Sequence, residues 1–337
     1  MEEQTTHVPQ QQPAHCTTVT PAMSASASVL SLSFLFLISF RLIGLSHAAS
    51  KCSVPTPLIN IPIFPTDIDL LQFALNLEHM EADWFLYGAL GFGLDAVAPE
   101  LVMGGPPPIG ATKANLDNVT NAIMAEFGYQ EVGHLRAIKS MVGGFPRPVI
   151  DLSGKHFAKI FDDAFGFHLD PPFDPYLNSV NYLLASYVIP YVGLVGYVGA
   201  NPNINGYLSK RLLAGLLAVE SGQDAVIRTL LYERANEVVQ PYKNLTVAEF
   251  TTKVSELRNK LASCGVKDEG LLVPVGWGAE NKTNSNVLSA NVNSVAYKRT
   301  PAEILRIVYG TGDEGTPGGF LPKGGDGAIA RGLLKFA

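Results

Sequence analysis

Helical periodicity along four long segments constrains the fold of this chain more than any other feature of its sequence. In each segment apolar residues recur three or four positions apart, which is the spacing of one face of an α-helix. Stretches rich in proline and glycine, which interrupt helices, separate the segments. The four helices are expected over residues 66–92, 113–142, 176–199 and 204–236, with Pro190 interrupting the third. Because the connection between the second and third helices is long, the pattern predicts an all-α four-helix bundle with an extended crossover.

Three shorter segments complete the helical part of the chain. Residues 155–165 are expected to form a connecting helix or loop across the bundle. A fifth helix is predicted over residues 247–263, and a short one over residues 301–309. Thr66 and Thr246 directly precede helical patterns and are good N-cap residues, so we expect them to begin the first and fifth helices.

The composition changes after Cys264, where Gly, Asn, Ser and Pro become frequent. We therefore assign residues 66–264 to the bundle and residues 265–337 to an irregular, glycine-rich C-terminal extension. The extension is expected to wrap around the bundle, with a separate structural unit as the alternative.

Residues 1–50 read as an N-terminal extension with a signal peptide. The run over residues 29–45 is apolar except for serines and one arginine, and small residues follow it up to Ser50, where cleavage is expected. The run is short for a membrane span, so we expect no stable membrane anchor after cleavage. The segment before it lacks the usual positive charge, which makes Met23 an alternative start. Residues 51–65 form a proline-rich lead-in to the bundle.

Cysteines and glycosylation motifs agree with entry into the secretory pathway. Removal of the signal peptide would leave Cys52 and Cys264, and an even pair in an oxidising compartment favours a disulfide, with two unpaired thiols as the alternative. Asn-x-Ser/Thr acceptor motifs occur at Asn118, Asn244 and Asn281. The sequence therefore predicts a secreted or endomembrane glycoprotein.

Composition and charge exclude some classes of function. The chain has 337 residues, 47% hydrophobic and 16% charged, which is enough to bury a large core. Its formal net charge of −6 offers no basic surface, so we expect no nucleic-acid partner. No glycine-rich phosphate loop stands at a strand–helix junction. A homo-oligomer and a small apolar ligand remain open as partners.

Acidic side chains interrupt the apolar stripes of three of the predicted helices. Glu78 and Glu81 lie on the two inner stripes of the first helix, Glu131 and His134 on that of the second, and Glu220 on that of the fourth. Several converging buried acids must be neutralised by protonation, by cations or by a metal, because a lone buried charge costs many kcal/mol.

Other polar residues are expected to face solvent. Gln72, Asn76, His79 and Asp83 recur at helical spacing on the opposite side of the first helix, and we interpret this stripe as its solvent face. On that basis His79 is no metal ligand. His156, in the connecting segment, is likewise expected to be solvated.

The Glu-x-x-His pattern of Glu131 and His134 presents both side chains to one point on a helix. Ferritin-like di-metal sites use two such pairs plus two further glutamates. A ferritin-like site carried over onto these positions would draw on Glu78 or Glu81, Glu131, His134 and Glu220, and the candidate ion would be a single Fe, Mn or Zn ion.

Residues 66–263 resemble the ferritin-like domain of plant desiccation-related proteins. The matching stretches are FALNLEHMEADWFLYGALG, EFGYQEVGHLRAIKSMVGGFPRP, YVIPYVGLVGYVGA and LLAVESGQDAVIRTLLYERAN, and the tail RTPAEILRIVYGTGDEGTPGGFLPKGG is also similar. The resemblance implies a secreted or endomembrane ferritin-like bundle associated with water-deficit stress. The extracellular space or apoplast and the vacuole are both open as its compartment. The resemblance implies no defined biochemical activity.

The sequence departs from a complete di-metal pattern at two positions. Gln223 stands where the second histidine is expected, and Pro190 stands about where the third helix would supply a carboxylate. Amide oxygen coordinates weakly and proline does not coordinate. The site is therefore expected to be degenerate, holding either one metal ion or none.

Two functions follow from this interior. The first is a secreted, stress-related protein with a protective or structural role. The alternative is an enzyme of plant metabolism that uses the buried cluster, either with one metal ion or metal-free. In the metal-free case Glu131, His134 and Glu220 would act as general acid and base on an apolar metabolite.

Overall fold

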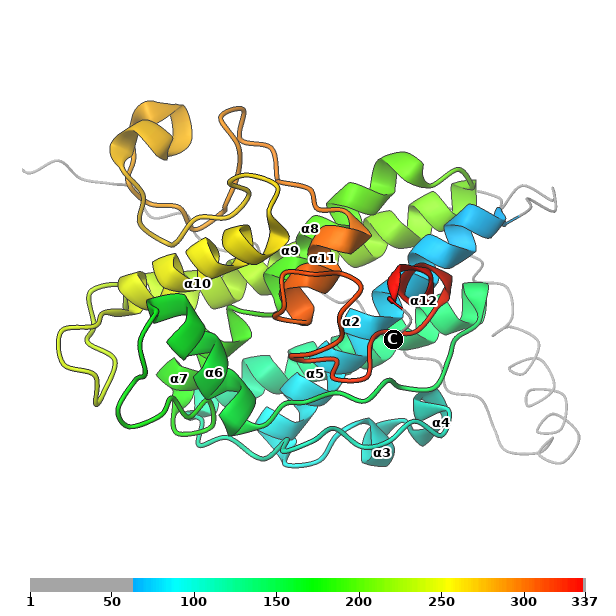
Figure 1. The fold of residues 1–337 in the computed structure, drawn as a ribbon, viewed down its shortest axis with the longest axis horizontal. Coiled ribbons are helices and arrows are strands. Elements are labelled where there is room, and N and C mark those ends of the chain that lie inside the picture. Colours follow the sequence, from blue (N-terminus) through cyan, green and yellow to red (C-terminus); the bar gives the residue numbers. More distant parts are fainter. Residues whose placement is uncertain (1–62, 336–337) are drawn as a thin grey trace, which may run out of the picture. The chain divides into compact units, whose positions relative to one another are not determined.

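The computed structural model describes residues 63–335, which fall within one compact unit of the chain. These residues form helices and irregular segments, joined by only a few isolated β-bridges. The bundle consists of α2 (Pro65–Leu90), α5 (Asn118–Val142), the broken rod α7 (Ser179–Ser186) and α8 (Pro190–Ala200), and α9 (Tyr207–Tyr232) (Figure 1). The predicted all-α four-helix architecture with a long crossover between the second and third rods is confirmed.

Shorter helices decorate the bundle. In chain order they are α3 (Leu94–Val97), α4 (Pro99–Val102), α6 (Gly154–Phe165), the 3-10 turn η1 (Asn201–Asn203), α10 (Val247–Ala262), the 3-10 turns η2 (Val275–Trp277) and η3 (Ala279–Asn281), α11 (Pro301–Val308) and α12 (Ala328–Leu333). The expected helices at residues 155–165, 247–263 and 301–309 agree with α6, α10 and α11 within a residue. The turns α3 and α4 and the terminal helix α12 were not expected.

The helix ends show which of the predicted N-cap residues begin a helix in the structure. Thr246 begins α10 in a capping box with Glu249, as predicted. Thr66 does not cap α2, because the helix begins one residue earlier at Pro65, which needs no amide partner at this position. Asp67 is instead buried and accepts hydrogen bonds from the backbone amides of Asn205 (2.9 Å) and Gly206 (2.7 Å), just before α9.

Proline divides the third rod of the bundle. Pro190 has no amide hydrogen to continue the hydrogen-bond ladder of α7, so that helix ends at Ser186 and α8 begins at Pro190 itself. The stretch Ser179–Asn203 is apolar and long enough to cross a membrane, but 78% of its apolar window is buried inside the fold. Its composition is therefore explained by its place in the core.

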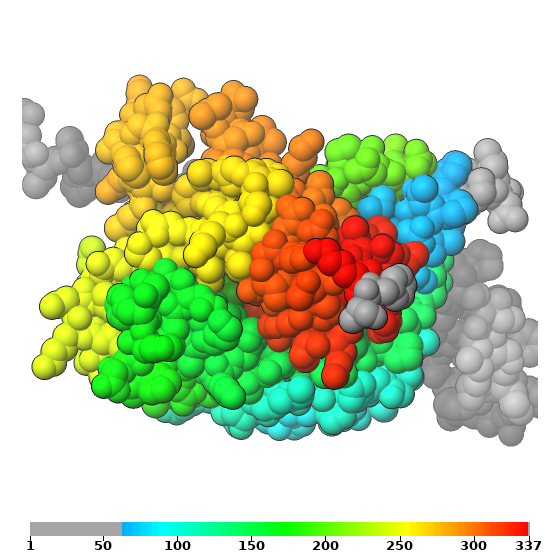
Figure 2. Space-filling view, in the orientation of Figure 1, coloured from blue at the N-terminus to red at the C-terminus, as the bar shows by residue number. Residues whose placement is uncertain are grey.

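The face of α2 that was expected to meet solvent is buried, and this expectation was wrong. Asn76, His79 and Asp83 are 0, 2 and 0% exposed. The Asn76 side chain accepts from the backbone amide of Asp326 (2.7 Å) and donates to its carbonyl (2.9 Å), so the C-terminal extension covers this part of the helix. Figure 1 shows α12 lying next to α2, and in Figure 2 the dark-orange and red residues lie between the yellow, green and blue segments that include α10, α6 and α2.

Some predictions fall on residues outside the described range. The signal peptide within residues 1–50 and the proposed partner Cys52 lie there, so secretion and the disulfide stay predictions. Cys264, just after α10, is exposed. The three glycosylation acceptors, Asn118, Asn244 and Asn281, are also exposed.

A buried ion pair holds the loop after α5 against α2. Arg147 donates to Asp83 at 2.9 Å, and both side chains are fully buried. Burial raises the pKa of Asp83 to about 6 even though the Arg147 charge opposes the shift. Asp83 also accepts from the amide of Leu94 (2.9 Å), which fixes the start of α3.

We predict that Arg147→Met lowers the free energy of unfolding by about 3–5 kcal/mol, because it leaves the Asp83 carboxyl buried without its partner. Arg136→Met is the matched control, since Arg136 is exposed on α5, and should change stability by no more than about 0.5 kcal/mol. Urea titrations of both variants measure the difference. Equal stabilities would show that the buried pair contributes nothing.

His156 of α6 is not solvated as expected. Its ring lies edge-on to Phe320 of the C-terminal extension, with centroids 4.4 Å apart. Burial lowers its pKa from 6.5 to about 4, since the opposing attraction of Asp151 is weaker. The imidazole is therefore neutral in the folded protein at pH values where an unfolded chain would protonate it.

A pH dependence of stability follows. Between pH 6.5 and 4 the unfolded chain binds a proton at His156 that the folded chain does not, so acidification destabilises the fold by up to about 3 kcal/mol. We predict that His156→Gln flattens the slope of unfolding free energy against pH in this window. His168→Gln, at a side chain 96% exposed, serves as the control. A wild-type slope in His156→Gln would contradict the assignment.

Candidate functional site

Three rods of the bundle bring acidic side chains to one buried point. Glu78 comes from α2, Glu131 and His134 from successive turns of α5, and Glu220 from α9. Each offers one ligand atom, and the four atoms all lie within 4.8 Å of one another. Glu131 and Glu220 are 0% exposed, Glu78 is 1% exposed and His134 7%.

His134 lies at the centre of this cluster. Its Nδ1 is 3.0 Å from Glu131 Oε2, 3.2 Å from Glu78 Oε2 and 3.6 Å from Glu220 Oε1. The helical spacing of three residues places Glu131 and His134 on the same face of α5, which packs along α2. One imidazole nitrogen thus meets carboxylates from three separate helices.

Glu81 lies one turn from Glu78 on α2 but outside this group of four. Both of its carboxylate oxygens are buried without a hydrogen-bond partner among the described residues, and so are both oxygens of Glu220. Gly193 of α8 is the nearby backbone: a Cβ added there would lie 3.2 Å from Glu81 and 3.3 Å from Glu220. The absence of a side chain at Gly193 therefore leaves room for both carboxylates.

The two departures from the di-metal pattern take different forms in the structure. Gln223 is buried, and its Nε2 donates to Glu131 Oε1 at 2.6 Å. At the position of the missing second histidine, the chain therefore has a side chain that orients the Glu131 carboxylate. Pro190 forms the start of α8 and offers no ligand atom. The third rod therefore gives the cluster no carboxylate.

Tyr197 is a member of the site that sequence reasoning missed. It lies one turn after Gly193 on α8, is buried, and donates its hydroxyl hydrogen bond to Glu78 Oε1. In the sequence it is one of several tyrosines along the apolar third helix, a pattern typical of core residues. Only the requirement that a buried hydroxyl finds a partner pointed to a polar role.

The cluster contains more acidic side chains than its one histidine can neutralise. Burial raises the pKa of Glu81 and Glu131 well above the usual value, and the neighbouring Glu220 adds to both shifts. Burial also raises the pKa of Glu220 to about 7. Burial opposes ionisation of Glu78 too, but the charge of His134 and the hydrogen bonds that Glu78 makes with His134 and Tyr197 together outweigh burial, and the pKa of Glu78 is lowered.

His134 shows the converse shift. Burial alone would lower its pKa, but the attraction of Glu78 and the hydrogen bond to Glu131 raise it above the usual value. Without another cation, the cluster therefore holds a proton on His134 and further protons on its acids. A bound metal ion would replace these protons, which is how carboxylate and imidazole ligands normally bind metals.

The residues present fit a metal ion of the carboxylate- and imidazole-binding type. The donors are oxygen and one imidazole nitrogen, which suit iron, manganese or zinc. Oxygens of Glu81 and Glu220 that lack partners are costly in a buried site unless a cation compensates them. We therefore regard the cluster as a candidate metal centre.

A small pocket, which we call the passage, lies between α2, α8 and α11, with half-exposed residues on one side and the buried acids on the other. Its volume is about 30 Å³, and its inner end is lined by Glu78, Glu81 and Tyr197. The remaining lining residues are Leu70, Phe73, Ala74, Leu77, Gly193, Gly196, Ala200 and Ile304. This is room for about one water-sized molecule.

Comparisons with known proteins place the chain in a family. A model of the ferritin-like domain matches residues 66–233. The chain is 65% identical over 268 residues to the ferritin-like catalase Nec2 of Nesocodon mauritianus, an alignment that covers 80% of this chain and 86% of that protein. It is 57% identical over 258 residues to the desiccation-related protein PCC13-62 of Craterostigma plantagineum, covering 77% and 82% respectively. No solved structure matches it. The resemblance drawn from the sequence is confirmed, and the chain belongs to the plant desiccation-related proteins with a ferritin-like domain.

Proposed function

We propose that this protein is a metal-dependent catalase that removes hydrogen peroxide under water-deficit stress. The observation that carries the proposal is a buried cluster of carboxylates and one histidine at the end of a passage that admits only a very small molecule. Similarity to a ferritin-like catalase and to a desiccation-related protein supports the activity and the setting. Peroxide removal would itself be the protective role.

The size of the passage supports hydrogen peroxide over a metabolite as the substrate. An apolar plant metabolite needs a pocket of several hundred Å³, as typical small-molecule sites have. The space beside Glu78 and Glu81 is about 30 Å³. Hydrogen peroxide, with two heavy atoms, fits this space far better than a metabolite does. Metal-free acid–base catalysis on a metabolite by Glu131, His134 and Glu220 is therefore the less supported alternative.

The reaction is 2 H₂O₂ → 2 H₂O + O₂, in which one peroxide is oxidised and the other is reduced. When bound, a redox-active ion such as iron or manganese supplies the electron exchange between the two peroxides. Zinc has no redox chemistry and does not suit this reaction. Glu78, Glu131, His134 and Glu220 would hold the ion, because their ligand atoms already converge.

The remaining residues of the site position groups and move protons. Gln223 fixes the orientation of Glu131 through its 2.6 Å hydrogen bond, and Tyr197 does the same for Glu78. Glu81 lines the passage with carboxylate oxygens that have no hydrogen-bond partner in the described part of the chain. It is therefore the carboxylate placed to take a proton from an entering peroxide and return it to the product water.

Secretion is part of the proposal. The apolar segment before Ser50 and the exposed positions of Asn118, Asn244 and Asn281 support passage through the secretory pathway. The apoplast or the vacuole would then be the compartment in which peroxide is removed.

The first test is metal content with peroxide turnover. Protein purified without chelators should contain about one iron or manganese ion per chain and release O₂ from hydrogen peroxide. Glu131→Gln should reduce metal content and turnover at least about tenfold, because it removes a ligand that acts through its charge. Elemental analysis and an oxygen electrode measure the two quantities.

Glu126→Gln is the matched control for that test, because Glu126 is exposed on the same helix. It should leave metal content and turnover at wild-type levels. If folded wild-type protein contains less than about a tenth of an equivalent of iron or manganese per chain, the proposal is wrong. Metal-loaded protein that releases no O₂ would also contradict it.

The second test is substrate size. Wild-type protein should decompose hydrogen peroxide but not tert-butyl hydroperoxide, because the bulky group exceeds the passage of about 30 Å³. Gly196→Val should slow hydrogen peroxide turnover by raising KM more than it lowers kcat, since a Cβ there lies 2.7 Å from Ile304 Cδ1 and narrows the passage. Gly133→Val, where a Cβ meets nothing within 4 Å, is the control. Equal turnover of both peroxides by the wild type would contradict entry through this passage.

A further inference from the structure

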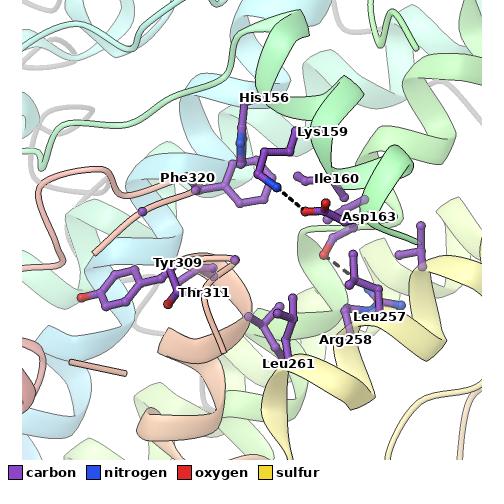
Figure 3. Close-up of a pocket in the computed structure, with 17 residues that line it drawn as sticks. His156, Lys159, Ile160, Asp163, Leu257, Arg258, Leu261, Tyr309, Thr311 and Phe320 are labelled. Atoms are coloured by element: carbon purple, nitrogen blue, oxygen red, sulfur yellow. Dashed lines mark hydrogen bonds and ion pairs between the residues drawn. The ribbon is translucent and has the colours of Figure 1, made fainter. Parts of the chain in front are cut away.

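A second, larger cavity lies away from the metal cluster. It has a volume of about 250 Å³ and is lined by α6, α10, the end of α11 and the C-terminal extension (Figure 3). Its lining is mostly apolar and includes Ile160, Val254, Leu257, Leu261 and Phe320. It shares no lining residue with the passage to the acids, so the peroxide site does not explain it.

We propose that this cavity binds one small, uncharged hydrophobic molecule of one or two rings. Protein interiors are close-packed, and a large apolar void forfeits dispersion contacts that a ligand restores. An apolar cavity of roughly 150 Å³ is enough to bind benzene. The larger volume here suits a second fused ring.

Every charged side chain on the wall already has a partner. Lys159 Nζ lies 2.6 Å from Asp163, as Figure 3 shows at the upper side of the cavity. Arg258 donates to Asp268 (3.1 Å) and to the carbonyl of Tyr187 (2.6 Å). No unpaired charge on this wall therefore remains to compensate an ionic ligand, whose desolvation would cost several kcal/mol.

His156, also on the wall, adds no charge. Its ring packs edge-on against Phe320, and burial lowers its pKa to about 4, so it is neutral above that pH. The ligand class that fits the wall is thus defined by the absence of charge as well as by size.

The cavity joins the C-terminal extension to the bundle. Ile160 and Val254 belong to bundle-packed helices, whereas Tyr309, Thr311 and Phe320 belong to the extension. A ligand in contact with both sides would add apolar contacts between them that the empty protein lacks. Binding should therefore raise the thermal stability of the whole chain.

Naphthalene is the probe, and 2-naphthoate, which has the same rings and a carboxylate, is the charged comparison compound. Calorimetric titration of the full chain should show naphthalene binding at one site per chain, with 2-naphthoate at least about tenfold weaker because its carboxylate finds no partner. Naphthalene should also raise Tm. Absence of naphthalene binding, or equal affinity for the two probes, would overturn the proposal.

Two variants locate the site. Val254→Phe and Leu261→Phe should each weaken naphthalene binding at least about tenfold by filling the cavity. Val254 is 1% exposed, so its variant carries some folding risk, whereas Leu261 is only half-buried and its variant tests the site if Val254→Phe does not fold. Val292→Phe, at a position 94% exposed, makes the same change in solvent and should bind naphthalene as the wild type does.

Unchanged binding by folded Leu261→Phe would place naphthalene elsewhere and overturn the assignment. Metal content and peroxide turnover are independent of these outcomes.

Discussion

Mutual repulsion among carboxylates enclosed in one helical bundle is the constraint on which the rest of this structure depends. Glu78, Glu81, Glu131 and Glu220 are all nearly inaccessible to water, and their charges cannot coexist there without compensation. The single His134 has three of them around one nitrogen. Its one positive charge balances one carboxylate, so the others must keep protons or share a cation. A bundle of this kind is less stable than one with an apolar interior, and retaining such acids is typical of a binding or catalytic site.

Much of this arrangement follows from local periodicity. The 3.6-residue repeat fixes which side chains share a face, so the inward direction of Glu78, Glu131 and Glu220 could be predicted from apolar neighbours three and four positions away. The same geometry places Glu131 and His134 together on α5 irrespective of what packs against them. Helix starts with a complete capping box, as at Thr246, were equally predictable because the signal lies within four residues.

What could not be predicted depends on contacts between distant parts of the chain. Asn76, His79 and Asp83 have the spacing of a solvent face, but Arg147 covers one end of the stripe and Asp326 the other. Asp326 lies 250 residues from Asn76, and no periodicity within α2 reports it. Asp67 likewise looks like a first-turn residue that favours the helix dipole, but it anchors the chain before α9, 138 residues away. Polar stripes on a helix therefore indicate either solvent or a covering segment, and sequence pattern alone does not separate the two.

The third rod shows how the missing carboxylate at Pro190 changes the site. Pro190 removes a possible carboxylate, and Gly193, one turn later, removes a side chain altogether. The space at Gly193 is taken by Glu81 from α2 and Glu220 from α9, whose oxygens lie 3.2 and 3.3 Å from where its Cβ would be. A carboxylate from the first rod thus approaches the region that the third rod leaves without one. Glu81 also lines the inner end of the passage, and it stays outside the group of four converging ligand atoms. Compared with the ligand set of a symmetric two-ion site, this cluster has fewer converging ligand atoms and one additional carboxylate, Glu81, which faces the passage.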